Sequence, residues 1–121
     1  MSIIIYHNPR CSKSRQTLSL IREQGHTPKI IEYLKEPPSV SEILNILSLL
    51  ELEPRAILRT KEEPYKELNL SNSDLTVDQL VEAIANNPIL MERPIVINGN
   101  KAAIGRPPEK VLAILYSQNN V

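Results

Sequence analysis

The fold of this chain is decided near its N-terminus, where residues 3–23 read IIIYHNPRCSKSRQTLSLIRE. The first four of these residues form an apolar run that predicts a short buried strand, and the Asn8-Pro9 pair that follows predicts a turn. Residues 12–23 contain neither proline nor glycine, so they predict a helix. A strand that turns directly into a helix points the first N–H groups of the helix at whatever lies in the turn.

The only cysteine of the sequence, Cys11, lies in this turn. A thiol at a helix N-terminus, close to Arg10, Lys13 and Arg15, should have a lowered pKa, because the helix dipole and the cations favour the thiolate. The same N–H groups and cations would hold an oxyanion. A lone cysteine is more often a buried, inert apolar residue. Here the basic flanks favour a reactive thiol, although the sequence leaves open whether these side chains point at the thiol or outward.

Length and composition narrow the class of protein. The 121 residues predict a single domain over 1–121. Lysine plus arginine and aspartate plus glutamate number 14 each, so the net charge favours neither a nucleic acid nor an anionic membrane as partner. No apolar run approaches the roughly 20 residues of a membrane span, and no signal-peptide pattern opens the chain, so a cytoplasmic protein is expected. His7 and His26 are too few for a zinc site, and no metal or bound cofactor is expected.

One cysteine also limits the redox chemistry. It excludes an internal disulfide and an internal dithiol cycle within this sequence. If Cys11 is oxidised during a reaction, the electrons must therefore come from a second molecule.

Further along the chain, residues 29–34, 93–97 and 101–104 predict three more strands. The first is expected to pair in parallel with the N-terminal strand, after a helix that ends near Gly25. The other two are expected to form an antiparallel hairpin through a type I′ turn at Asn98-Gly99. Two prolines, Pro107 and Pro108, are expected in the first turn of a C-terminal helix.

Residues from about 37 to 88 predict helices only. Capping boxes begin at Ser39 and at Thr76, and each precedes an apolar stripe at helical spacing: Ile43, Ile46, Leu47 and Leu50, then Val77, Leu80, Val81 and Ile84. Shorter helical segments are expected at 54–59 and 65–68. The order β-α-β, helical insertion, β-β-α predicts an α/β protein with a thioredoxin-like four-stranded mixed sheet and a helical insertion. In that layout the first strand-to-helix turn carries a reactive cysteine.

Four motifs, in this order and spacing, resemble the glutaredoxin-coupled arsenate reductase family over essentially the whole chain: HNPRCSKSR (7–15), EPY (63–65), NPILMERPIV (87–96) and GRP (105–107). The short members of the family are the closest in pattern. By position, the resemblance implies that Cys11 attacks arsenate and that Arg59, Arg93 and Arg106 bind the oxyanion. Arginine suits that role because its planar fork of donors binds an oxyanion bidentately and keeps its charge.

The resemblance also implies supporting residues. His7 and Ser14 would tune the thiolate, although a purely structural hydrogen bond for His7 is equally compatible with the sequence. Pro94 resembles the cis-proline that this fold places beside its reactive cysteine. The family's well-studied reductases carry Gly-Thr after the cysteine, where this chain has Ser12-Lys13.

The implied reaction has three stages. The Cys11 thiolate forms a covalent adduct with arsenate, glutathione attacks as the reductant so that As(V) becomes As(III), and glutaredoxin clears the mixed disulfide. Arsenate, glutathione and glutaredoxin are thus the expected partners. One alternative is a non-catalytic or low-activity redox or regulatory module that binds a protein, although Ser14 stands where a Cys-x-x-Cys switch needs its second cysteine. Another is a cysteine phosphatase, although Cys11 and Arg15 are only four residues apart, where such sites use six.

Overall fold

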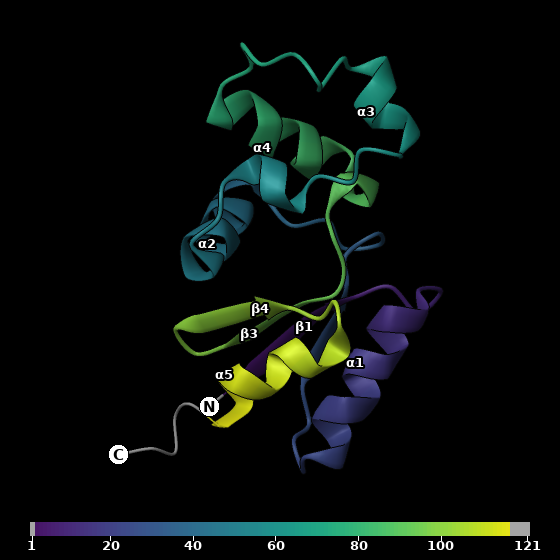
Figure 1. Ribbon diagram of the computed structural model, residues 1–121, viewed down its shortest axis with the longest axis vertical. Helices are drawn as coiled ribbons and strands as arrows, with labels where there is room; N and C mark the ends of the chain where they lie inside the picture. The colour runs from purple at the N-terminus through teal and green to yellow at the C-terminus, as the bar shows by residue number, and fades with distance from the viewer. Residues whose placement is uncertain (1, 117–121) are drawn as a thin grey trace. The chain divides into compact units, whose positions relative to one another are not determined.

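The computed structural model describes residues 2–116 of the chain, which form two compact units. One unit combines the N-terminal part, up to Glu36, with the C-terminal part, from Arg93 onward. The other unit is Pro37–Glu92. The first contains all strands of the described chain, and the second is helical (Figure 1).

The sheet has four strands in the order β2-β1-β3-β4, with bounds β1 (Ile3–His7), β2 (Lys29–Glu32), β3 (Ile95–Asn98) and β4 (Lys101–Ile104). β1 pairs in parallel with β2 and antiparallel with β3, and β3 pairs antiparallel with β4. This mixed sheet, entered through a β1–α1 turn, confirms the predicted thioredoxin-like α/β fold. β2 ends two residues earlier than predicted, because the N–H groups of Lys35 and Glu36 both donate to the Glu32 carbonyl and turn the chain.

One face of this sheet packs against α1 (Ser12–Glu23), the 3₁₀ helix η3 (Pro108–Val111) and α5 (Leu112–Tyr116) (Figure 1). The core between them consists of Ile3, Ile5, Leu18, Ile21, Val96, Val111, Ile114 and Leu115. Burying a large aliphatic side chain of this kind contributes about 1.5–3 kcal/mol. Gly25, with a φ of 87°, follows the end of α1, as the sequence predicts.

The β3–β4 hairpin differs from its prediction by one residue. Asn98 pairs with Lys101, so the two central turn residues are Gly99 and Asn100. Only Gly99 has a positive φ, of 64°, which is the pattern of a type II′ turn rather than type I′. The cause is tertiary: Asn98 is buried and its Nδ2 donates to the Ile114 carbonyl at 2.8 Å, which keeps it in the strand.

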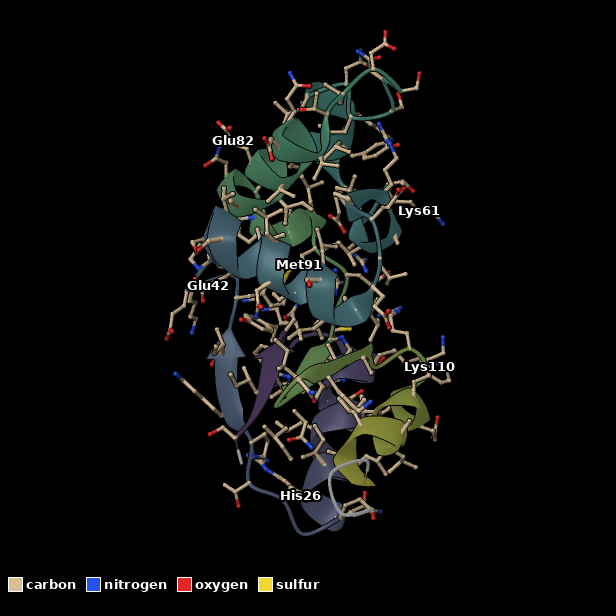
Figure 2. All side chains as sticks on the ribbon, turned by 90° about the vertical axis from the view of Figure 1, so that its left-hand side faces the viewer. His26, Glu42, Lys61, Glu82, Met91 and Lys110 are labelled. Carbon is tan, nitrogen blue, oxygen red and sulfur yellow. The ribbon has the colours of Figure 1, made fainter. Side chains whose placement is uncertain are left out.

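The helical unit contains α2 (Val40–Leu50), η1 (Pro54–Ile57), α3 (Glu63–Glu67), α4 (Val77–Asn86) and η2 (Pro88–Leu90). Both predicted capping boxes are present, Ser39 with Glu42 and Thr76 with Gln79. α2 packs against α4. The buried side chains of this unit include Ile46, Ile84, Leu90 and Met91, and Met91 is labelled in Figure 2. Val77 is 51% exposed, so its assignment to the apolar stripe is wrong.

This unit extends to Glu92, past the predicted end of the insertion at about residue 88. The reason is an antiparallel bridge between Leu58 and Met91, which ties the segment after η2 to the segment after η1. That these two units form one domain, as the length predicts, stays a prediction. Within residues 2–116 no helix has both the length and the apolar character needed to cross a membrane.

Candidate active site

The turn between β1 and α1 is built around Asn8. The Asn8 side-chain oxygen accepts from the Arg10 N–H, and its carbonyl accepts from the Cys11 N–H, both at 3.0 Å. Cys11 is then the N-cap residue of α1, with extended backbone (φ −94°, ψ 123°). The thiol therefore lies at the positive end of α1, where the sequence places it.

Ser14, in the first helical turn of α1, closes the β1–α1 turn by contacting the residues at the end of β1. Its Oγ accepts from the Asn8 N–H at 3.0 Å and lies 2.6 Å from His7 Nδ1. All three residues are buried. Burial lowers the pKa of His7, opposed by Glu32 and assisted by Arg22 and Arg15, so the ring is neutral at neutral pH. His7 and Ser14 thus form one buried hydrogen-bonded pair beneath the thiol turn, and a tuning role for them stays a prediction.

Two arginines from distant sequence approach the thiol. Arg106 Nη1 lies 3.8 Å from Cys11 Sγ and also donates to the Arg93 carbonyl at 3.1 Å. Burial by itself raises the pKa of the Cys11 thiol, but the Ser14 N–H, the Arg93 guanidinium and the Lys13 N–H outweigh it, so the pKa lies below its ordinary value. The site favours a thiolate.

The hairpin places both arginines. Arg93 precedes β3 and Arg106 follows β4, and the two ends are joined because the Gly105 N–H donates to the Pro94 carbonyl at 2.9 Å. The Arg93–Pro94 peptide bond is cis, as predicted for Pro94. The Arg106–Pro107 bond is also cis, and Pro107 precedes η3 rather than lying within a helix, which the sequence reasoning missed.

Gly105 is a point of close approach between the hairpin and α1. A Cβ at this position would lie 2.5 Å from Thr17 Oγ1 and 2.9 Å from Pro94 Cγ. The Thr17 hydroxyl donates to the Lys13 carbonyl at 2.8 Å and lies 3.4 Å from the Gly105 carbonyl oxygen. Only glycine fits this space, because the backbone at Gly105 lies directly against the first turns of α1. This contact fixes the position of the backbone just before Arg106.

Arg59 belongs to the helical unit, whereas Cys11, Arg93 and Arg106 belong to the sheet unit. Its Nε donates to Glu62 Oε2 at 3.1 Å and its Nη1 donates to Glu92 Oε1 at 3.0 Å. Both carboxylates escaped the sequence reasoning. An Arg and a Glu three residues apart on a turn is a common pairing that could have indicated Glu62, whereas the Glu92 contact depends on tertiary pairing.

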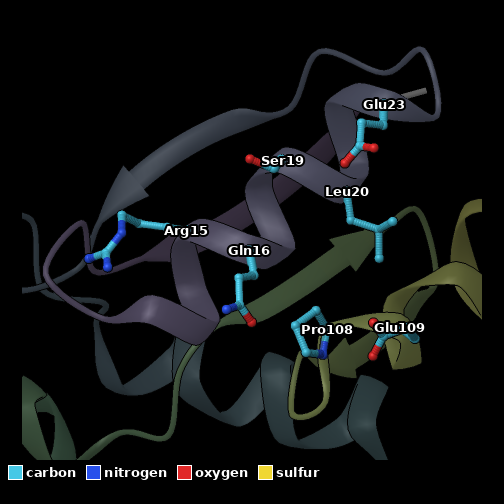
Figure 3. A pocket seen from close by; sticks show the side chains of 7 residues that line it. All are labelled: Arg15, Gln16, Ser19, Leu20, Glu23, Pro108 and Glu109. Carbon is cyan, nitrogen blue, oxygen red and sulfur yellow. The ribbon is translucent and has the colours of Figure 1, made fainter.

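The other basic residues of the turn do not surround the thiol. Arg10 and Arg15 are exposed. Arg15 Nη1 donates to the Pro9 carbonyl at 2.9 Å, and its side chain extends from α1 at one end of an open cavity of about 380 Å³ (Figure 3). Gln16, Ser19, Leu20, Glu23, Pro108 and Glu109 line the rest of that cavity, which lies along α1 and η3. Lys13 contributes its backbone N–H. Among residues 2–116, no group of three or more His, Cys, Asp or Glu residues could hold a metal ion.

The sheet unit thus brings a thiol of lowered pKa close to two of the three predicted arginines, Arg93 and Arg106. A family model identifies the chain independently of this geometry. The model of the ArsC family matches residues 6–114. The chain belongs to the ArsC family. The resemblance drawn from the sequence motifs is thereby confirmed.

Relatives within the ArsC family match this chain nearly end to end. The arsenate reductase of Haemophilus influenzae is 54% identical over 116 residues, which cover 95% of this chain and 100% of that protein. The arsenate reductase of Neisseria meningitidis serogroup A is 49% identical over 114 residues, covering 93% and 97%. The solved structure of an arsenate reductase from Vibrio cholerae has 54% identity and a TM-score of 0.92, covering 94% of this chain and 98% of that chain.

Proposed function

We propose that this ArsC-family protein reduces arsenate to arsenite, with Cys11 as the nucleophile and with glutathione and glutaredoxin as the source of electrons. The observation that carries the proposal is the thiol itself, which lies 3.8 Å from Arg106 Nη1, accepts from Arg93 and has a lowered pKa. Relatives about half identical over nearly their whole length bear the name arsenate reductase.

In the first step the Cys11 thiolate attacks arsenic and a water molecule leaves, which forms a sulfur–arsenic(V) bond. Arg93 and Arg106 would hold the arsenate oxygens, because a charged guanidinium makes short, strong hydrogen bonds to an oxyanion. Arg59 is the third proposed oxyanion ligand. Arg59 is ion-paired to Glu92, and Glu92 immediately precedes Arg93 in the sequence. Arg59 and Arg93 are therefore linked through a single residue.

In the second step a glutathione thiolate attacks the Cys11 sulfur. A disulfide forms between the two sulfurs, the sulfur–arsenic bond breaks, and its electron pair stays on arsenic, which becomes As(III) and leaves as arsenite. A glutaredoxin thiol then displaces Cys11 from the mixed disulfide. Because Cys11 is regenerated and the sequence holds one cysteine, both electrons of the cycle come from external thiols, one of glutathione and one of glutaredoxin. Such a cycle fits the reducing environment of a cytoplasm.

The test is arsenite production from arsenate, glutathione and glutaredoxin, with the parent compared with Cys11→Ser. We expect turnover in the parent and none in the variant. An inactive parent whose thiol still titrates below the value of a free thiol would reject arsenate as the substrate and favour another oxyanion. Release of phosphate from an aryl phosphate would favour the phosphatase, and an inert thiol would favour a protein-binding module.

A further inference from the structure

Arg59 is held by two carboxylates through two different nitrogens. Its Nε donates to Glu62 and its Nη1 to Glu92, and the three side chains are only 22%, 22% and 26% exposed. Two contacts to different nitrogens fix the plane of a guanidinium, whereas one would leave it free to rotate. Within residues 2–116 its Nη2 donates to no described side chain or carbonyl, so that nitrogen remains available for a ligand.

The backbone holds the two carboxylates in place. The Arg59 N–H donates to the Leu90 carbonyl and the Glu92 N–H donates to the Ile57 carbonyl, both at 2.8 Å. With the Leu58–Met91 bridge between them, these bonds pair residues 57–59 with residues 90–92 in antiparallel fashion. Leu58 and Met91 are buried. Glu92 therefore lies beside Arg59 because of a buried pairing, not because two long side chains meet on the surface.

Charge neutralisation does not require this arrangement. One carboxylate is enough to neutralise one guanidinium, so neutralisation alone does not explain why two carboxylates contact Arg59. An isolated partly exposed ion pair contributes only about 0–1 kcal/mol to stability. An arginine without partners, however, loses considerable side-chain entropy when a ligand immobilises it. Two carboxylates immobilise it before the ligand arrives.

We propose that Glu62 and Glu92 are positioning residues, which orient the Arg59 guanidinium so that its Nη2 is presented to the oxyanion. This inference rests on the proposed function, in which Arg59 binds arsenate. Glu62 and Glu92 act through Arg59 and do not touch the oxyanion themselves.

The experiment measures how sulfate, a non-reducible tetrahedral oxyanion, slows alkylation of Cys11 by iodoacetamide. Cys11 is the only cysteine, so the alkylation rate reports on one site. The sulfate concentration that halves the rate is compared among the parent, Glu92→Ala, Glu92→Gln and the same two changes at Glu62. KM and kcat for arsenate are measured alongside. Glu63→Ala is the matched control, because Glu63 is exposed and next to Glu62 in the sequence, and the substitution removes the same charge.

We expect the alanine variants to need about three- to tenfold more sulfate, the factor that corresponds to one long side chain left to be immobilised by the ligand. KM for arsenate should rise by a similar factor, with kcat changed less than about twofold. The glutamine variants should stay within about twofold of the parent or bind sulfate more tightly, because the amide oxygen still accepts from arginine while the opposing charge is gone. Glu63→Ala should leave the sulfate concentration unchanged.

Arg59→Ala completes a double-mutant cycle with Glu92→Ala. In that background Glu92→Ala should have no further effect, since its role acts through Arg59. The inference is overturned if alanine and glutamine both tighten sulfate binding, which would make the carboxylates competitors of the anion. It is also overturned if the alanine variants lower stability without changing protection by sulfate. The same holds if Arg59→Ala needs no more sulfate than the parent, or if sulfate does not slow alkylation of the parent at all. A parent that sulfate protects but that does not reduce arsenate would reject the proposed function alone.

Discussion

The reactivity of Cys11 depends on residues from both ends of the sequence. The backbone N–H groups of Ser14 and Lys13 are its neighbours along the chain, whereas Arg93 approaches from the β3 side of the hairpin. Burial opposes these three by raising the pKa of the thiol. The conspicuous cation beside the thiol in the sequence, Arg10, is exposed. A residue adjacent in sequence thus contributes less than one that is 82 positions away.

Replacing Arg93 with alanine should raise the pKa of Cys11, because the guanidinium that stabilises the thiolate is lost while the Arg93 carbonyl that binds Arg106 is kept. The iodoacetamide alkylation rate rises with pH as the thiolate forms. In the parent its midpoint should lie below the roughly 8.5 of a free thiol. In Arg93→Ala the midpoint should move to higher pH.

The matched control for this prediction is Arg10→Ala, which removes a cation next to Cys11 in sequence. Its midpoint should stay at the parent value. A larger upward shift in Arg10→Ala than in Arg93→Ala would contradict the assignment of the thiolate to the Arg93 guanidinium.

At the scale of elements, the site depends on two junctions. The β1–α1 turn is closed by Ser14, which satisfies the Asn8 N–H and contacts His7. The end of β4 is pressed against α1 at Gly105, whose N–H binds the Pro94 carbonyl. Each junction positions one half of the thiol site, since Cys11 lies in the first and Arg106 follows the second.

Ser14→Ala should destabilise the protein by about 1–3 kcal/mol, because the buried Asn8 N–H and the His7 ring both lose their partner. The measurement is the free energy of unfolding in urea. Ser19→Ala, an exposed serine on the same helix, is the control and should change stability by less than about 0.5 kcal/mol. Equal losses in the two variants would mean that the hydrogen bonds of Ser14 contribute nothing to the turn.

Gly105→Ala should cost about 1–3 kcal/mol of stability, because the new methyl group meets Thr17 Oγ1 at 2.5 Å and the neighbouring backbone must shift. Arsenate KM should also rise, since Arg106 follows directly. Thr17→Ala removes both Thr17 atoms that crowd the position. In the double variant part of the Gly105→Ala loss should be recovered. Strictly additive losses in urea unfolding would contradict the close approach.

At the scale of the whole molecule, the proposed reaction draws on both units and on a second molecule. Cys11, Arg93 and Arg106 come from the sheet unit, and Arg59 comes from the helical unit. The pairing of residues 57–59 with 90–92 ends at Glu92, where the chain passes from one unit into the other. Because the sequence has a single cysteine, the thiol that attacks Cys11 and the thiol that later releases it both come from external donors.

With arsenate and glutathione but no glutaredoxin, the reaction should therefore stop after about one turnover, with one glutathione bound to Cys11 as a mixed disulfide. Mass spectrometry of the intact protein should find one adduct per chain, and glutaredoxin should remove it. Cys11→Ser should carry none. Sustained turnover with glutathione alone, and no adduct, would contradict the proposed order of thiols.

The sequence by itself determined the elements of this protein. The strand–turn–helix at residues 3–23, both capping boxes, the succession of strands and helices along the chain and the place of Cys11 follow from local patterns, because apolar periodicity, capping and proline or glycine act over a few residues. The family motifs added Arg59, Arg93 and Arg106 by resemblance. Only the tertiary structure decided the one-residue shift at Gly99, the close approach at Gly105 and the contact of Glu92 with Arg59. Each of these depends on contacts between segments far apart in the chain, and such contacts leave no periodic signal in the sequence.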